Sequence, residues 1–276
     1  MKADLHIHSN CSDGSDTVEE LAEKINSSDL DIVALTDHDT TDGLKKFGEL
    51  ISSDKKFIRG IELTCLAGEI KCHILGYYIN PETPELKALI EKGKVLRRQK
   101  LETRIKYLKD VHGIELTKEE LDWLYSRRSV VKTHLANILV KRGLAKSNIP
   151  AMKKYLDDCK TGNTKFDGIE AINVIKKSGG IPVWAHPLGG EGEEHISQDL
   201  LQKQLIKMKE YGIEGLECYY SRYSEEEMKF LVKTAKEHNL FITGGSDYHG
   251  TNKDIPLGRL NNKDIKIDAK NFTIFK

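Results

Sequence analysis

The chain has 276 residues, of which 38% are hydrophobic and 31% charged, so we expect a buried core of one domain, or of one domain with an insertion. Lys and Arg together number 43, as do Asp and Glu, and this balance gives no electrostatic argument for a nucleic-acid or membrane partner. No apolar segment is long enough for a membrane span. The five cysteines lack a paired spacing, which is typical of reduced thiols in the cytoplasm.

Short apolar runs alternate with helical stretches along most of the chain, a pattern typical of parallel strands joined by crossover helices. The expected strands cover residues 3–8, 32–36, 57–64, 71–79, 181–185, 215–219 and 240–244. Helix starts between them show a small polar residue followed three positions later by Glu, as in Asp16 with Glu19, Asp167 with Glu170 and Ser224 with Glu227. The pattern predicts an α/β fold.

Residues 81–165 break this alternation, because they contain no convincing strand. The expected helices of this region cover residues 84–111, which are strongly basic, 117–125 and 134–142. We therefore predict a barrel domain formed by residues 1–80 and 166–276, with a helical insertion domain over residues 81–165. The charge of the insertion fits either a solvated flap or a substrate lid.

Two histidines of the first expected strand, His6 and His8, lie two residues apart, so both imidazoles project from one face. A single histidine on a strand is more often a core residue with satisfied hydrogen bonds. A pair at this spacing, followed by the polar loop of residues 9–14, favours a metal site.

Histidines and carboxylates also lie at or near the ends of five further expected strands. These residues are Asp37, His38, Asp39, Glu62, His73, His186, Asp247 and His249. A parallel barrel builds its active site at the C-terminal ends of its strands, so we expect these side chains to meet. Imidazole and carboxylate ligands without paired thiolates suit Zn, Mn or Fe.

Four motifs, in this order, resemble those of the PHP family, which is named for polymerase and histidinol phosphatase domains. They are Asp-x-His-x-His at residues 4–8, Thr-Asp-His-Asp at 36–39, Ala-His-Pro at 185–187 and Ser-Asp-x-His at 246–249. The resemblance covers the whole chain. It implies a distorted (β/α)7 TIM-like barrel with a helical insertion, in agreement with the seven expected strands.

The resemblance also implies two or three divalent metal ions (Mn, Fe or Zn) at three positions. The first ion would be held by His6, His8, Glu62 and Asp247. Glu62 would bridge to the second ion, which His73 and His186 would complete. The third ion would be held by Asp13, His38 and His249. Some relatives have a histidine where Asp13 stands, and every other expected ligand is present.

Within the family, the chain resembles the branch that acts on nucleotides and RNA 5′ ends, which includes nucleoside 3′,5′-bisphosphate phosphatases and 5′–3′ exoribonucleases. The similarity lies in the helical insertion, its basic helix and the segment of residues 133–136. It implies hydrolysis of a phosphate monoester of a nucleotide or short RNA by a hydroxide held between two metals. Arg97, Lys132 and His134 would contact the phosphate, and the catalytic residues would be Asp13, His38, Glu62 and His249.

Two other functions remain open for this chain. A histidinol-phosphate phosphatase would share the metal chemistry, and a non-catalytic, metal-binding regulatory module would share the ligands. A metal-bound water, His134 or Asp39 could each protonate the leaving oxygen. The sequence indicates a small phosphorylated substrate, no membrane association and no obligate protein partner.

Overall fold

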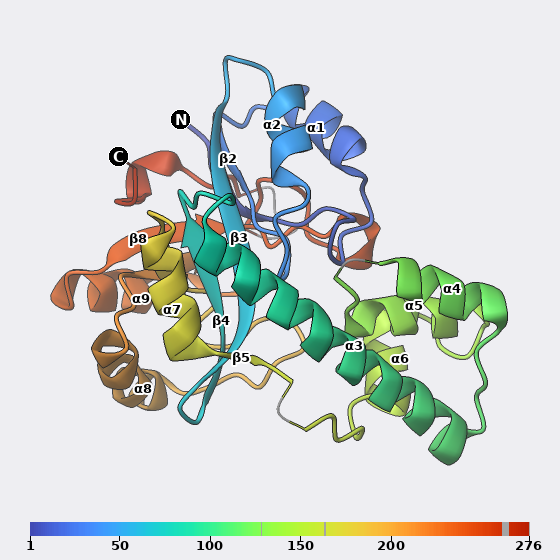
Figure 1. The fold of residues 1–276 in the computed structure, drawn as a ribbon. Coiled ribbons are helices and arrows are strands. Elements are labelled where there is room, and N and C mark those ends of the chain that lie inside the picture. The colour runs from blue at the N-terminus through green and yellow to red at the C-terminus, as the bar shows by residue number, and fades with distance from the viewer. Residues whose placement is uncertain (128, 163, 261–264, 276) are drawn as a thin grey trace.

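The strands of the computed structural model form a sheet that curls into a nearly closed barrel (Figure 1). The structure describes residues 1–127, 129–162, 164–260 and 265–275. The strands in these ranges are β1 (Ala3–Ile7), β2 (Ile32–Leu35), β3 (Lys56–Ala67), β4 (Ile70–Tyr77), β5 (Phe166–Asp167), β6 (Ile181–Trp184), β7 (Gly215–Tyr220) and β8 (Phe241–Gly245). Hydrogen bonds join them in the order β1-β2-β3-β4-β6-β7-β8, and β5 pairs with β3.

The barrel closes where the segment after β8 returns to β1. Tyr248 forms a parallel bridge with Ile7, and the His8 N–H donates to the Tyr248 carbonyl at 2.9 Å. The two backbones come so close that a Cβ atom at Gly245 would lie 2.3 Å from His6 Cβ. Only glycine permits this approach, and it brings the histidines at the end of β1 next to the residues that follow β8.

The predicted α/β barrel is confirmed, but the expectation of parallel strands throughout is wrong for β4. This strand is antiparallel to both β3 and β6. Only Gly68 and Glu69 separate β3 from β4, a connection that suits a hairpin and is far too short for the crossover that parallel strands need. As a result, the beginning of β4 lies at the same end of the barrel as the C-terminal ends of the parallel strands.

Helices cover one face of the sheet. They are α1 (Val18–Asn26), α2 (Leu44–Leu50), α7 (Gly168–Lys177), α8 (Gln198–Glu210) and α9 (Glu225–Glu237), and two short 3-10 turns, η1 (Gly250–Asn252) and η2 (Ala269–Asn271), lie near the C-terminus. Alternate strand residues serve different apolar clusters: Val33 and Leu35 pack under the helices, whereas Ile32 and Ala34 belong to a cluster on the opposite face. The barrel is therefore packed on both faces.

Helix capping agrees with the sequence at two of the three expected starts. The Asp167 side chain caps α7 by accepting the Glu170 N–H at 2.9 Å. Ser224 and Glu227 form the predicted capping box of α9. For α1 the prediction was wrong by one residue, because the box uses Thr17 and Glu20. The Asp16 carboxylate instead accepts hydrogen bonds from Lys24 and Tyr248.

All secondary-structure elements described between β4 and β5 are helices. It contains α3 (Pro84–His112), α4 (Lys118–Ser126), α5 (Lys132–Lys141) and α6 (Asn148–Tyr155), and no strand occurs in its described residues. Three of these helices match the predicted ones closely, whereas α6 was not expected. An apolar cluster packs these four helices against one another. The division of the chain into two domains stays a prediction.

Helix α3 connects the two parts of the molecule, as Figure 1 shows. Its first turns place Leu86, Leu89 and Ile90 in the cluster that lies under the barrel helices, and its later turns place Leu101 and Leu108 in the cluster of the insertion. One rigid element of 29 residues therefore belongs to both apolar clusters.

Glycine 93 allows α3 to lie close to the barrel. A Cβ atom at this position would lie 2.3 Å from Cζ of Phe166 in β5. Since real side chains do not approach so closely, the crossing of α3 over β5 depends on the missing side chain.

Among the described residues, no helix has the length and apolar character that a membrane crossing requires.

We expect Gly93→Ala to lower the free energy of unfolding by about 1–3 kcal/mol, because overpacking outweighs the gain of about 1 kcal/mol that alanine brings to a helix. Urea denaturation measures the change. Phe166→Leu removes the ring that the new Cβ meets, so the double variant should be less destabilised than the sum of the two single variants. A Gly93→Ala protein more stable than the wild type would contradict the packing argument.

Candidate metal centre

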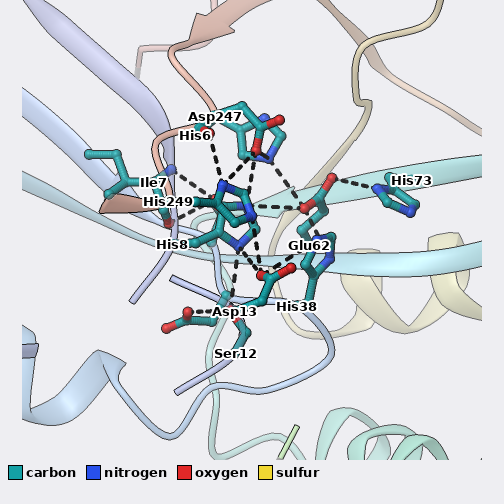
Figure 2. A network of polar contacts seen from close by, with 12 residues as sticks. His6, Ile7, His8, Ser12, Asp13, His38, Glu62, His73, Asp247 and His249 are labelled. Atoms are coloured by element: carbon teal, nitrogen blue, oxygen red, sulfur yellow. Dashed lines mark hydrogen bonds and ion pairs between the residues drawn. The ribbon is translucent and has the colours of Figure 1, made fainter. Parts of the chain in front are cut away.

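The ligands predicted from the sequence converge at one end of the barrel (Figure 2). They come from β1 and the loop after it (His6, His8, Asp13), from the segment after β2 (His38), from β3 (Glu62), from β4 (His73), and from the segments after β6 (His186) and β8 (Asp247, His249). Glu62 and His73 lie inside their strands rather than at the ends, which corrects the expectation for these two. They still reach the centre, because β3 extends beyond the neighbouring parallel strands and β4 runs back along it.

Glu62 is the hub of the centre. One of its oxygens, Oε2, lies 3.2 Å from His6 Nε2, 3.2 Å from His8 Nε2 and 3.1 Å from His38 Nδ1. The other, Oε1, lies 3.0 Å from His73 Nδ1 and 3.2 Å from His186 Nε2. The carboxylate therefore separates two groups of imidazoles, which is the position of a ligand that bridges two ions.

Two further carboxylates complete the centre. Asp13 Oδ1 lies 3.1 Å from His249 Nε2, and Asp247 Oδ1 lies 3.5 Å from the Nε2 atoms of both His6 and His8. Three groups have ligand atoms that all lie within 4.8 Å of one another: His8, Asp13, His38 and His249; His6, His8 and Asp247; His38, Glu62 and His73. His8 belongs to two of these groups, so it lies between two candidate ion positions.

The centre has the donor atoms that a divalent metal needs, and several of these atoms form no hydrogen bond with the described residues. Five buried atoms facing one another lack any hydrogen-bond partner in the described chain: His6 Nε2, His8 Nε2, Asp13 Oδ1, His38 Nδ1 and Glu62 Oε2. Buried polar atoms without partners are costly, at about 1–3 kcal/mol each. Ligation of metal ions would satisfy all five at once.

The protonation states of Glu62 and His8 fit metal ligands. Burial alone would raise the pKa of Glu62, but the surrounding imidazoles, His38 and His6 foremost, together outweigh burial and lower that pKa well below its usual range. Burial lowers the pKa of His8 to about 4, and the nearby His249 adds to this effect. Glu62 is therefore ionised and His8 neutral at pH 7, the forms in which these side chains bind metals.

Glu217 of β7 supports the centre, and our sequence analysis missed it. Its Oε1 lies 2.9 Å from His6 Nδ1, and its Oε2 accepts the backbone N–H of His186 at 2.8 Å. Burial opposes a charge on His6, but Glu217, Glu62 and Asp247 together outweigh burial and raise the pKa of His6 well above its usual value. A carboxylate on the far nitrogen of a ligand histidine fixes the ring and makes it a stronger ligand.

Other neighbours hold the remaining ligands. Asp247 Oδ2 accepts hydrogen bonds from Tyr220 Oη at 3.0 Å and from Lys253 Nζ at 2.5 Å, so only Oδ1 faces the histidines. Glu193 Oε2 lies 3.2 Å from His186 Nδ1. Neither Lys253 nor Glu193 stood out in the sequence, since both lie in loops without a motif.

The acids of the first two motifs stabilise loops. Asp4 accepts the N–H of Ser246 at 2.9 Å and so fixes the segment that carries Asp247. Asp37 accepts the Ser9 N–H at 2.8 Å and the Ser12 hydroxyl at 2.6 Å in the first loop. Both acids therefore act around the candidate ligands rather than as ligands themselves.

Two ligand candidates have an unusual backbone conformation. His186 has a φ of 28° and Asp247 a φ of 58°, in the left-handed region that residues other than glycine rarely adopt. Asp39, next to His38, has a φ of 54°. Each such residue costs about 1–3 kcal/mol, and this kind of strain is concentrated at functional sites.

A cavity opens from the metal centre towards the insertion. The candidate ligands Glu62, His73 and His186 line one side, and Arg97 and Lys132 of the insertion line the other. The insertion thus brings positive charge to the mouth of the centre.

The predicted phosphate-binding residues differ in their surroundings. Arg97 is buried, forms an ion pair with Asp39, and lies 3.4 Å from the Thr64 hydroxyl. Lys132 pairs with Asp157 at 2.7 Å. His134 does not line the cavity: its Nδ1 accepts the Val131 N–H at the start of α5. Burial lowers the pKa of His134 to about 4, so this ring is neutral.

We expect Glu217→Gln to weaken divalent-metal binding by about 10- to 100-fold, because partners of metal-bound histidines commonly contribute that much affinity. Competition with a chromophoric chelator measures the affinity, and thermal unfolding tests the fold. Glu214→Gln, which removes an acid that pairs with Lys176 away from the centre, is the matched control. Equal metal affinity in the two variants would show that Glu217 has no role in holding the ligands.

Comparison with known proteins agrees with this geometry. The PHP domain profile matches residues 4–174. The 3′,5′-nucleoside bisphosphate phosphatase of Chromobacterium violaceum is 28% identical over 254 residues, which are 89% of this chain and 86% of that protein. The 5′-3′ exoribonuclease Rnm of Escherichia coli is 31% identical over 262 residues, 93% of this chain and 88% of that protein. A solved structure described as an amidohydrolase from Chromobacterium violaceum, with bound sulfate and no metal, is 26% identical, has a TM-score of 0.82, and is matched over 92% of this chain and 90% of its own. The chain belongs to the PHP domain family.

Proposed function

We propose that this metal-dependent phosphoesterase removes a phosphate from a nucleoside 3′,5′-bisphosphate or from the 5′ end of a short RNA. The observation that carries the proposal is the Glu62-centred cluster at one side of a cavity whose other side is basic. Negative charge develops on the phosphoryl oxygens during hydrolysis, so a site for this reaction needs cations on several sides. Relatives named for nucleotide and RNA substrates support the same substrate class.

Two or three divalent ions, Mn, Fe or Zn, would be held as the family resemblance implies. His6, His8, Glu62 and Asp247 would hold one, Glu62, His73 and His186 a second, and Asp13, His38 and His249 a third. The orphaned atoms of His6, His8, Asp13, His38 and Glu62 support this assignment. Bound metals would supply Lewis acidity and a water of lowered pKa.

The residues of the centre have distinct proposed roles. Asp13, His38, Glu62 and His249 would be the catalytic residues, since all four line the cavity where the phosphate enters. Asp39 would position Arg97, because its carboxylate already accepts the Arg97 guanidinium and the Thr64 N–H. Its engagement makes Asp39 a weak candidate for the proton donor.

Arg97 and Lys132 are the proposed phosphate contacts in the insertion. Arg97 presents a planar guanidinium that Asp39 orients, a geometry that suits phosphate oxygens. Lys132 would exchange its partner Asp157 for the substrate. His134 is the weakest of the three proposals, since its Nδ1 is engaged by the backbone of its own helix.

The alternatives have less support. The two relatives described above are named for nucleotide and RNA substrates rather than for histidinol phosphate. A non-catalytic module would be expected to lose ligands, and all the predicted ligands meet at one centre. We also propose the cytoplasm as the location, in line with five cysteines that are all free thiols.

We expect Mn²⁺-loaded protein to release one phosphate from adenosine 3′,5′-bisphosphate. Chelation should remove the activity, because the site then lacks the ions that would bind the phosphate. A colorimetric phosphate assay measures both. Histidinol phosphate, assayed in parallel, should be the poorer substrate. Faster release from histidinol phosphate would reverse the substrate proposal.

We expect His6→Ala and Asp247→Ala to lower turnover by at least about 10³-fold, since each change removes a ligand on which the electrostatic stabilisation depends. The fold should survive, because the apolar clusters on both faces of the barrel remain intact. Steady-state kinetics and thermal unfolding measure the two effects. His195→Ala, which removes an exposed histidine paired with Glu227, is the control and should behave as the wild type. Full activity in either ligand variant would refute the metal centre as the site of reaction.

A further inference from the structure

Three half-buried cations on the insertion side of the cavity form no ion pair with the part of the chain that the structure describes. They are Lys100 and Arg104 of α3 and Lys165, which precedes β5, and all three line the cavity that opens from the metal centre. Each is half-buried, and none forms an ion pair or a hydrogen bond from its cationic group with the described residues. The Nε atom of Arg104 is buried without any hydrogen-bond partner.

Among the other cations that line this cavity, three form ion pairs and Lys153 of α6 is exposed to solvent. Arg97 pairs with Asp39, Lys132 with Asp157, and Lys253 with Asp247. Among the acids, Glu193 has the strongest charge interaction with Lys165, but Glu193 already pairs with His186. Lys100, Arg104 and Lys165 are therefore half-buried cations without an ion-pair partner among the described residues.

The spacing on α3 places these cations in a row. Arg97, Lys100 and Arg104 lie at positions i, i+3 and i+7, which fall on one face of a helix. With a rise of 1.5 Å per residue, Lys100 lies about 5 Å and Arg104 about 11 Å further along the helix axis than Arg97. Because Arg97 contacts Thr64 of β3, near the metal centre, the row leads away from the metals.

The electrostatics agree with a site that lacks its anion. Burial lowers the pKa of Lys100 to about 7, and the charges of Arg104 and Arg97 add to the effect. Burial also lowers the pKa of Arg104 to about 10. Both groups are held in a place that disfavours their charge, and an anion between them would reverse this.

We propose that Lys100, Arg104 and Lys165 bind a second phosphate of the substrate, which is not hydrolysed, while the scissile phosphate lies at the metal centre. The inference rests on the proposed function and specifies which nucleotides the site prefers. The phosphate would be either the second phosphate of a nucleoside 3′,5′-bisphosphate or the next phosphodiester of a short RNA. Guanidinium and ammonium groups suit both, since each donates charge-assisted hydrogen bonds to phosphate oxygens.

The test compares catalytic efficiencies for substrates with one phosphate and with two. Adenosine 5′-monophosphate and adenosine 3′-monophosphate each have one, adenosine 3′,5′-bisphosphate has two, and a 5′-phosphorylated diadenosine has a phosphodiester beside its 5′-phosphate. The quantity measured is the ratio of kcat/KM for each doubly phosphorylated substrate to kcat/KM for the better of the two monophosphates. We expect Arg104→Gln and the double variant K100Q/K165Q to lower this ratio by about 10- to 100-fold, the usual consequence of losing a hydrogen bond to a charged group.

Lys106→Gln is the matched control, because Lys106 lies on the same helix, is exposed and pairs with Asp110. It should leave the ratio as in the wild type. Thermal unfolding provides a second readout: the Arg104 and Lys100 variants should be at least as stable as the wild type, since they remove unpaired charge from a crowded site.

The outcomes separate the inference from the function on which it rests. A lower ratio for the bisphosphate identifies a site for the second phosphate of a mononucleotide, and a lower ratio for the dinucleotide identifies an RNA backbone site; either supports the inference. An unchanged ratio for both substrates, in variants that stay folded, overturns it while the proposed function stands. If the wild type releases phosphate from none of these substrates, the proposed function is wrong and the inference falls with it.

Discussion

The whole molecule depends on one constraint, which is that a buried carboxylate, Glu62, lies within 3.2 Å of five imidazoles. Taking a carboxylate out of water costs several kcal/mol, and the cost is recovered only where cations or donors surround it. The strands supply those partners through their pairing. The return of the chain from β8 to β1 brings His6 and His8 next to Asp247, and the antiparallel β4 places His73 beside β3. The strand pairing that closes the barrel thus also assembles the metal site.

The insertion contributes to the site through a single rigid element. Helix α3 packs its first half on the barrel and its second half in the insertion, so the cations along one of its faces have a fixed distance from the metal centre. Gly93 and Phe166 set how closely this helix approaches. Helix α3 would therefore fix the distance between a phosphate at the metals and a second phosphate along its length. This arrangement relates packing between the two parts of the molecule to substrate choice.

Much of the site was predictable because its signals are local. The spacing of His6 and His8 and the motif around Asp247 follow from side-chain direction in strands and from the family resemblance. The antiparallel direction of β4 was missed, although only Gly68 and Glu69 lie between the strands. Glu217 was missed because a lone acid has no motif. Its position within an apolar run that reads as a buried strand was nevertheless a signal, since acids are rarely buried without a partner. The unpaired state of Lys100 and Arg104 is a property of the tertiary structure, since it depends on which carboxylates other side chains occupy.

The most direct test of the account is anomalous diffraction at the zinc edge from crystals of the protein grown with Zn²⁺. We expect peaks in the space that His6, His8, Asp13, His38 and Glu62 enclose, with metal–nitrogen distances of about 2.0–2.1 Å. Glu62 should contact two of them through different oxygens. Density without anomalous signal, with Glu62 still bonded directly to the surrounding imidazoles, would contradict the claim that these side chains are gathered to bind metal ions.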